Sequence, residues 1–148
     1  MEQRLSLVTL GVRDLARARK FYEEGLGWSR NGGVEAEVAF YQLGGMILAL
    51  WGRDSLAADG RLTLAAIEPG QSFGGLALAY NTRSEAEVDA VLAEAAAAGG
   101  LVLKPAEKTD WGGYAGYFAD PDGHPWEVAW NPFWTLRDDG RVSLEAPA

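Results

Sequence analysis

The sequence predicts an α+β fold in which two βαβββ modules form a curved mixed sheet around a cavity. Two observations lead to this fold class. A strand, a helix and further strands follow one another in the same order in both halves of the 148 residues. Alternation along the expected strands also separates a face of bulky apolar side chains from a face of mostly small ones. We expect the bulky face to pack on a helix. The other face is expected to line a ligand cavity, unless the C-terminal tail or another subunit fills it.

The first module is expected at residues 5–51. Its opening stretch, Leu5–Val12, alternates as a strand, and Asp14 has the side chain of a helix N-cap. Apolar residues then recur at helical spacing until Leu26, where neighbouring glycines end the helix. The remaining strands of this module are expected within 28–33, at 37–43 and at 46–51, the last two joined by the Gly44–Gly45 turn.

The second module is expected at residues 74–131, after a connection over 52–73 that is rich in turn residues. A strand over 75–80 leads to Ser84–Glu87, which has the pattern of a capping box. An apolar stripe predicts a helix up to Gly99, and a strand begins at Leu101. Residues 132–148 form a C-terminal tail of the same domain, which spans 1–148. Phe133 and Trp134 in this tail are expected to dock over a pocket mouth or on a partner subunit.

The last hairpin contains the best candidate for a functional carboxylate, Glu127. Asp120–Gly123 reads Asp-Pro-Asp-Gly, a strong turn sequence, and aromatic residues that favour strands flank it. Alternation places Glu127 and Ala129 on one face, with the bulky Trp126 and Val128 on the other. Glu127 is therefore expected either to anchor a ligand or act as a base, or to be a carboxylate held by neighbouring polar groups.

Composition narrows the function classes. The chain is 48% hydrophobic and 23% charged, which is typical of a globular protein. Its net charge of −8 and lack of a basic patch argue against nucleic-acid binding. The absence of Cys excludes thiol catalysis, and the single histidine, His124, excludes a multi-His metal site. We expect His124 to be a solvent-exposed structural residue. No stretch has the length of a signal peptide or membrane span, which predicts a cytoplasmic protein without a membrane partner.

Three stretches together resemble the vicinal oxygen chelate superfamily, which includes glyoxalases, bleomycin-resistance proteins and extradiol dioxygenases. They are Val12–Leu15, Phe21–Trp28 and Asp120–Val128. The resemblance covers about residues 5–131, and its motifs are specific for the family but not for one activity. It implies paired βαβββ modules that close around a cavity, commonly in a homodimer.

The resemblance also implies where a metal would bind. Metal-dependent relatives place one ligand on each of four strands, at positions that match Leu7, Ala49, Gly75 and Glu127. Only Glu127 has a side chain that can ligate a divalent ion. We therefore expect the metal-free branch of the family, without metal or cofactor.

The function expected from the sequence is binding of a small organic ligand, cationic or aromatic, in a metal-free cavity. Two alternatives remain open: an enzyme that uses Glu127 as its base, without a metal or with an atypical one, and an interaction module whose cavity its own tail fills. The candidate ligand-binding residues lie on the small-residue face or on aromatic side chains near it. They are Leu7, Thr9, Ala49, Trp51, Gly75, Ala77, Tyr114, Tyr117 and Glu127.

Overall fold

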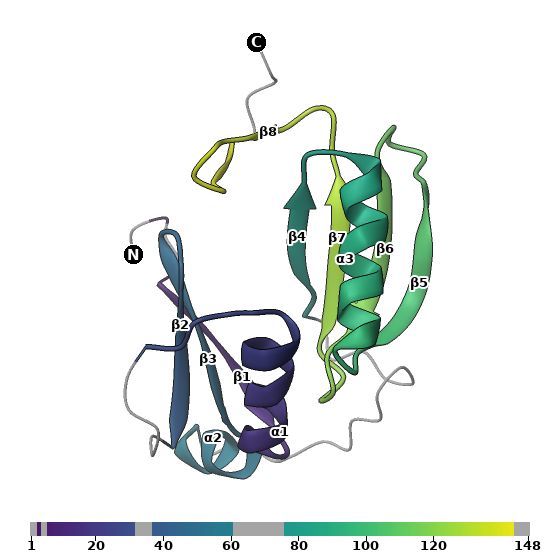
Figure 1. The fold of residues 1–148 in the computed structure, drawn as a ribbon. Coiled ribbons are helices and arrows are strands. Elements are labelled where there is room, and N and C mark those ends of the chain that lie inside the picture. The colour runs from purple at the N-terminus through teal and green to yellow at the C-terminus, as the bar shows by residue number, and fades with distance from the viewer. Residues whose placement is uncertain (1–2, 4–5, 32–36, 61–75, 144–148) are drawn as a thin grey trace. The chain divides into compact units, whose positions relative to one another are not determined.

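A computed structural model describes residue 3 and residues 6–31, 37–60 and 76–143. The chain divides into two compact units, Met1–Ala66 and Ile67–Ala148. Figure 1 shows a helix-covered sheet in each unit. The mixed α+β fold with curved sheets that the sequence predicts is confirmed.

The sheet of the first unit has the strand order β1-β3-β2. β1 (Leu7–Val12) runs parallel to β3 (Met46–Gly52), and β2 (Val38–Leu43) runs antiparallel to β3. The strand expected within 28–33 is reduced to a single bridge between Asn31 and Phe40 among the described residues. Leu10, Val12, Leu48 and Leu50, predicted on the helix-facing side, are all buried, whereas on the other face Leu7 is exposed and Ala49 is buried.

The helical stretch that follows β1 packs on this sheet. α1 (Leu15–Arg19) begins at Asp14, whose carboxylate accepts a 3.0 Å hydrogen bond from the Arg17 N–H. It continues as a π-helix, η1 (Lys20–Gly25), whose hydrogen bonds span five residues instead of four; the Leu26 N–H donates to the Phe21 carbonyl at 2.9 Å. Phe21 and Tyr22 lie on the wider turn and are completely buried, with their rings in an edge-to-face contact. The helix predicted after Asp14 is therefore present, with a change of winding.

A short helix replaces part of the connection expected over 52–73. α2 (Arg53–Asp59) packs against β1 and β3. Gly11 permits this contact, because a Cβ at that position would lie 3.2 Å from the Arg53 Cβ. The flanking Gly52 and Gly60 gave the stretch the look of a loop, although its interior consists of residues that are compatible with a helix.

The second unit contains the complete predicted βαβββ order. Its sheet has the order β4-β7-β6-β5, with β4 parallel to β7 and the other pairs antiparallel. Figure 1 shows α3 lying across one face of this sheet. The elements are β4 (Leu78–Thr82), α3 (Glu85–Ala97), β5 (Leu101–Lys108), β6 (Tyr114–Ala119) and β7 (Pro125–Trp130).

α3 begins with the predicted cap in a modified form. Ser84 Oγ accepts a hydrogen bond from the Glu87 N–H at 3.2 Å, as in a capping box. The Glu87 carboxylate accepts from the N–H of Arg83 at 2.7 Å, one residue before the position we expected. The helix sits close to β6, because a Cβ on Gly116 would lie 2.6 Å from Leu92 Cδ1 of α3.

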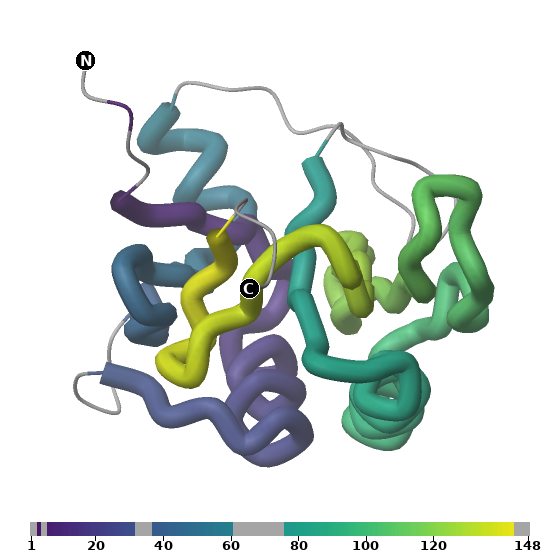
Figure 2. The backbone as a smooth tube through the Cα atoms, turned by 90° about the horizontal axis from the view of Figure 1, so that it is seen from above, coloured from purple at the N-terminus to yellow at the C-terminus, as the bar shows by residue number. Residues whose placement is uncertain are grey.

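The tail forms a small hairpin of β8 (Thr135–Leu136) and β9 (Val142–Ser143). Figure 2 shows the chain turning back after β7 to form it. Phe133 and Trp134, which were expected to be covered, are 57% and 41% exposed within this chain. No helix among the described residues is long and apolar enough to cross a membrane.

Candidate functional site

The turn before β7 is fixed by a buried aspartate. Asp120 is 2% exposed, and its Oδ1 accepts hydrogen bonds from the N–H groups of Asp122 and His124, both at 2.9 Å. The Gly123 N–H donates to the Asp120 carbonyl at 2.9 Å, and Gly123 has a φ of 91°, which favours glycine. The predicted turn is therefore present, and it sets the alternation of β7.

His124 belongs to the support of this turn. Its Nδ1 lies 2.9 Å from Asp120 Oδ2, and its side chain is only 20% exposed. Our expectation of a solvent-exposed residue needs correction, because the ring bends back to the buried carboxylate. The contact assigns His124 to the structure of the turn.

Glu127 lies in a row of side chains that crosses the whole second sheet. It is the register partner of Ala79 on β4 and of Tyr117 on β6, and Tyr117 is in turn the partner of Lys104 on β5. Partners in register lie on the same face, with Cβ atoms about 5 Å apart. We call the face of the second sheet opposite α3, which carries Ala79, Glu127, Tyr117 and Lys104, the open face.

The polar groups of the row interact with one another. The Tyr117 hydroxyl donates a hydrogen bond to the Glu127 carboxylate. Burial raises the pKa of Tyr117, and the negative charge and hydrogen bond of Glu127 raise it further. The Lys104 ammonium forms a 2.8 Å ion pair with Glu107. The hydrogen bond to Glu107 is the main cause of the raised pKa of Lys104, with smaller contributions from Tyr117 and Glu127.

Small side chains surround this polar row. Ala115 and Ala129 are register partners on the same face, two residues away from Tyr117 and Glu127 along their strands. They are 2% and 6% exposed. Asn81 is the register partner of Ala129, and its Nδ2 approaches the Ala129 carbonyl at 3.5 Å, which is a weak contact. Glu107 is the register partner of Ala115, so it lies on this face too. The open face therefore presents two carboxylates, Glu127 and Glu107, and the Lys104 ammonium above a floor of alanines.

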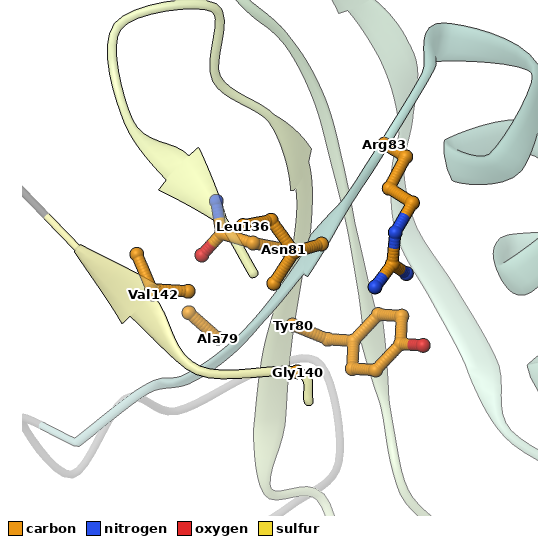
Figure 3. A pocket seen from close by; sticks show the side chains of 7 residues that line it. All are labelled: Ala79, Tyr80, Asn81, Arg83, Leu136, Gly140 and Val142. Carbon is orange, nitrogen blue, oxygen red and sulfur yellow. The ribbon is translucent and has the colours of Figure 1, made fainter. Parts of the chain in front are cut away.

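A pocket of about 160 Å³ lies beside this row, between β4 and the tail hairpin. Figure 3 shows side chains from both segments around it. The Arg83 guanidinium donates a 3.1 Å hydrogen bond to the Arg137 carbonyl and so ties the hairpin to the end of β4. Ala79 belongs both to the wall of this pocket and to the row of Glu127. The lining residues are Ala79, Tyr80, Asn81, Arg83, Leu136, Gly140 and Val142.

One predicted site residue lies on the wrong face. The Tyr114 hydroxyl donates a 3.0 Å hydrogen bond to Asp89 of α3, and Lys108 lies 5.7 Å from the centre of its ring. Tyr114 has the same parity on β6 as Gly116, which packs against α3, whereas Tyr117 has the opposite parity. The grouping of Tyr114 with Glu127 is therefore corrected.

The remaining predicted residues lie in different places. Thr9 and Ala49 are register partners on the first sheet, and Leu7 and Trp51 share their face. Leu7 is 41% exposed, whereas Ala49 is 1% exposed. Ala77 is an exposed residue just before β4, and Gly75 lies outside the described residues. Sequence reasoning missed Lys104 and Asn81, for which the only signal was their place on expected strands or strand ends.

The first unit has a shallow pocket of its own. It has a volume of about 260 Å³, and Trp28 and Tyr41 form its aromatic part, with ring centres 5.8 Å apart. Ser29, Gln42 and Leu43 complete the lining. This pocket lies at the end of β2, and none of its lining residues was predicted as a ligand contact.

The donor set does not fit the metal centre that the resemblance implies. Leu7 and Ala49 occupy two of the expected ligand positions, and their hydrocarbon side chains cannot coordinate a divalent ion. Gly75, at a third position, likewise has no side-chain donor. Over residues 6–31, 37–60 and 76–143, no group of three or more His, Cys, Asp or Glu could hold a metal.

The order β4-α3-β5-β6-β7 is a βαβββ module, and it places the chain in the class of α+β proteins built from such modules. The model of the glyoxalase/bleomycin resistance protein/dioxygenase superfamily matches residues 4–128. The chain belongs to this superfamily.

Solved structures place the chain more finely within the fold. A glyoxalase-related enzyme from Fulvimarina pelagi is 41% identical, with a TM-score of 0.87 over 98% of this chain and 100% of that one. A glyoxalase/bleomycin resistance protein/dioxygenase from Nocardioides is 25% identical, with a TM-score of 0.71 over 88% and 84%. A lactoylglutathione lyase from Agrobacterium tumefaciens, at 21% identity and a TM-score of 0.66 over 93% and 100%, shares the fold. No curated protein matches the chain significantly.

Proposed function

We propose that the protein binds a small organic ligand on the open face without a metal ion, with Glu127 as the anionic anchor. The observation that carries this proposal is the position of Glu127. It is a half-buried carboxylate held by the Tyr117 hydroxyl on a face where small alanine side chains, Ala79, Ala115 and Ala129, surround it. A mostly apolar surface with a few convergent polar groups is the usual make-up of a small-molecule site.

The chemistry of this surface favours a ligand with a cationic or hydrogen-bond-donating group. A carboxylate accepts hydrogen bonds at several lone pairs, and one bond from Tyr117 leaves others for a ligand. The overall charge of −8 raises the local concentration of cations around the protein. The ring of Tyr117 offers an apolar surface beside the carboxylate, which suits an aromatic or alkyl portion of the ligand.

Independence from metal follows from the ligand positions. A single carboxylate without further donors binds divalent ions weakly compared with the three or four protein ligands of metal sites. With Leu7, Ala49 and Gly75 at the other positions, Glu127 can serve a ligand directly.

A thermal-shift screen of cationic and aromatic compounds in the presence of EDTA tests this function, because a ligand that binds only the folded state raises the melting temperature. We expect hits that persist with EDTA and disappear in Glu127→Gln. Glu85→Gln is the matched control, because Glu85 lies on α3 and pairs with Lys108. Stoichiometric Zn, Ni, Mn or Fe in the purified protein, or binding that EDTA abolishes, would contradict the proposal.

A second candidate is an enzyme that acts without a metal and uses Glu127 as a general base. It is favoured by the hydrogen bond from Tyr117, which orients the carboxylate, and by the similarity to a structure described as a glyoxalase-related enzyme. The Glu127→Gln variant separates the two functions once a ligand is found. A base is indicated if turnover is lost while affinity is kept, and an anchor if affinity itself is lost.

We also propose that the protein forms a homodimer. Leu101, Val102 and Leu103 begin β5, the outer strand of the second sheet, and are 51%, 36% and 39% exposed. An exposed apolar edge strand is a template for pairing with another chain, and exposed apolar patches mark interaction sites. Sedimentation velocity should give the mass of a dimer, and a monomer at micromolar concentration would contradict this.

A further inference from the structure

On the open face, Lys104 and Glu127 carry opposite charges on either side of Tyr117, and Glu107 lies beside Lys104 as a second carboxylate. Lys104 on β5 and Glu127 on β7 are both register partners of Tyr117 on β6. Irregularities in β5 on both sides of Lys104 shift the pairing with β6 at this point. Four residues along the same strand, Lys108 instead reaches Glu85 on the opposite side of the sheet.

We propose that this row binds a small zwitterion, with its ammonium group at Glu127 and its carboxylate at Lys104. This inference rests on the proposed function and specifies the class of ligand. It requires that both charged groups of the protein can accept a ligand group and that the ligand has a suitable length.

Lys104 can exchange its present partner for a ligand carboxylate. Its ion pair with Glu107 joins side chains that are 43% and 62% exposed. Exposed pairs of this kind contribute little, because water screens both charges. The Lys104 ammonium has three donors, so it can also hold the ligand and Glu107 together.

The geometry of the sheet sets the length of the ligand. Neighbouring strands lie about 4.8 Å apart, so the backbones that carry Lys104 and Glu127 are about 10 Å apart across β6. An α-amino acid holds its two charges too close together to reach both groups, whereas an ω-amino acid with several methylenes spans the distance. Its methylenes would lie over Tyr117.

The test compares ω-aminocarboxylates from glycine to 6-aminohexanoate with pentylammonium and pentanoate, which each carry one charge. We expect an affinity optimum at 4-aminobutyrate or 5-aminopentanoate by calorimetry. The best zwitterion should bind about tenfold more tightly than either singly charged probe, as one added charged hydrogen bond implies.

Substitutions at Lys104 and Glu127 test which residue binds the carboxylate of the ligand and which binds its ammonium group. Lys104→Met should lower the affinity for 5-aminopentanoate about tenfold and leave that for pentylammonium unchanged. Glu127→Gln should weaken both. Lys108→Met is the matched control, since Lys108 is an exposed lysine on the same strand that pairs with α3. It should change neither affinity.

The outcomes separate this inference from the function on which it rests. If pentylammonium binds as tightly as the zwitterions and depends on Glu127, the zwitterion proposal is wrong and the anionic anchor stands. If no zwitterion binds, or if Lys108→Met matches Lys104→Met, the proposal is also wrong. If the compound screen gives metal-independent hits that do not respond to Glu127→Gln, the anchor itself is wrong.

Discussion

Among the residues that the structure describes, each unit has a glutamate that accepts a hydrogen bond from a tyrosine, and the surroundings of the two glutamates differ. In the first unit, Glu23 Oε1 accepts a hydrogen bond from the Tyr41 hydroxyl at 3.2 Å and from Arg19 Nε at 3.0 Å. Arg30 Nε lies 3.1 Å from the same oxygen. In the second unit, Glu127 accepts a hydrogen bond from Tyr117 on the open face.

The difference in partners gives the two carboxylates different roles. The hydrogen bond from Arg19 is the main cause of the lowered pKa of Glu23. The hydrogen bond from Tyr41 joins η1 to β2. Burial, with the nearby charge of Glu23, strongly raises the pKa of Tyr41. Glu23 is thus saturated by partners within its own unit, which is typical of a structural group. Glu127 accepts a hydrogen bond from Tyr117 and lies in register with the exposed Ala79, on the same face as the partly exposed Lys104, which suits a ligand.

The sharpest test of this comparison exchanges each carboxylate for an amide. Glu23→Gln should lower the free energy of unfolding by about 2 kcal/mol, because the charged hydrogen bond from Arg19 and the ion pair with Arg30 lose their anionic partner. Glu127→Gln should change it by less than about 0.5 kcal/mol. Urea denaturation of both variants measures the difference. Equal losses would contradict the division into a structural and a binding carboxylate.

Lowering the pH should remove the stability difference between wild type and Glu23→Gln. The pKa of Glu23 is lower in the folded protein than in the unfolded chain, so ionisation of this group stabilises the fold. This contribution is complete above the unfolded pKa of about 4.3 and is lost as the pH falls through the folded value. The stability gap between wild type and Glu23→Gln should therefore shrink as the pH is lowered from about 7 to about 3, as urea titrations at several pH values would show. A gap independent of pH would mean that Gln disturbs packing instead.

Removing the tyrosine hydroxyls should also cost more stability in the first unit than in the second, with smaller losses than for the glutamates. Tyr41→Phe removes a hydrogen bond to a carboxylate inside the cluster and should cost about 1 kcal/mol. Tyr117→Phe should cost less than about 0.5 kcal/mol, but it should weaken ligand binding severalfold because Glu127 loses the group that orients it. Chemical denaturation and calorimetry on the same two variants separate the effects. A larger stability loss in Tyr117→Phe would reverse the assignment.

Most of the fold could be predicted because its signals are local. Asp14 and Ser84 mark helix starts by their capping side chains, and the turn at Asp120–Gly123 fixes the parity of the next strand. α2 was missed because a seven-residue helix between glycines has little periodicity to detect.

The site was predicted only as far as alternation could be trusted. Glu127 and Tyr117 were placed on one face by counting from a recognisable turn, and the register confirms that they are partners. Lys104 could not be found in this way, because irregular pairing on β5 shifts the count between Val102 and Glu107. A bulge of this kind depends on the partner strand and leaves no clear mark in the sequence.

The smallest expected effect tests the correction at Tyr114. Tyr114→Phe removes an exposed hydrogen bond to Asp89 on the α3 side and should leave ligand affinity unchanged. Tyr117→Phe, the same chemical change three residues further along the same strand, should weaken binding. The pair holds the residue type and strand constant and varies only the face. Calorimetry with one ligand from the screen is the measurement, and equal effects on affinity would show that the ligand does not distinguish the two faces of this sheet.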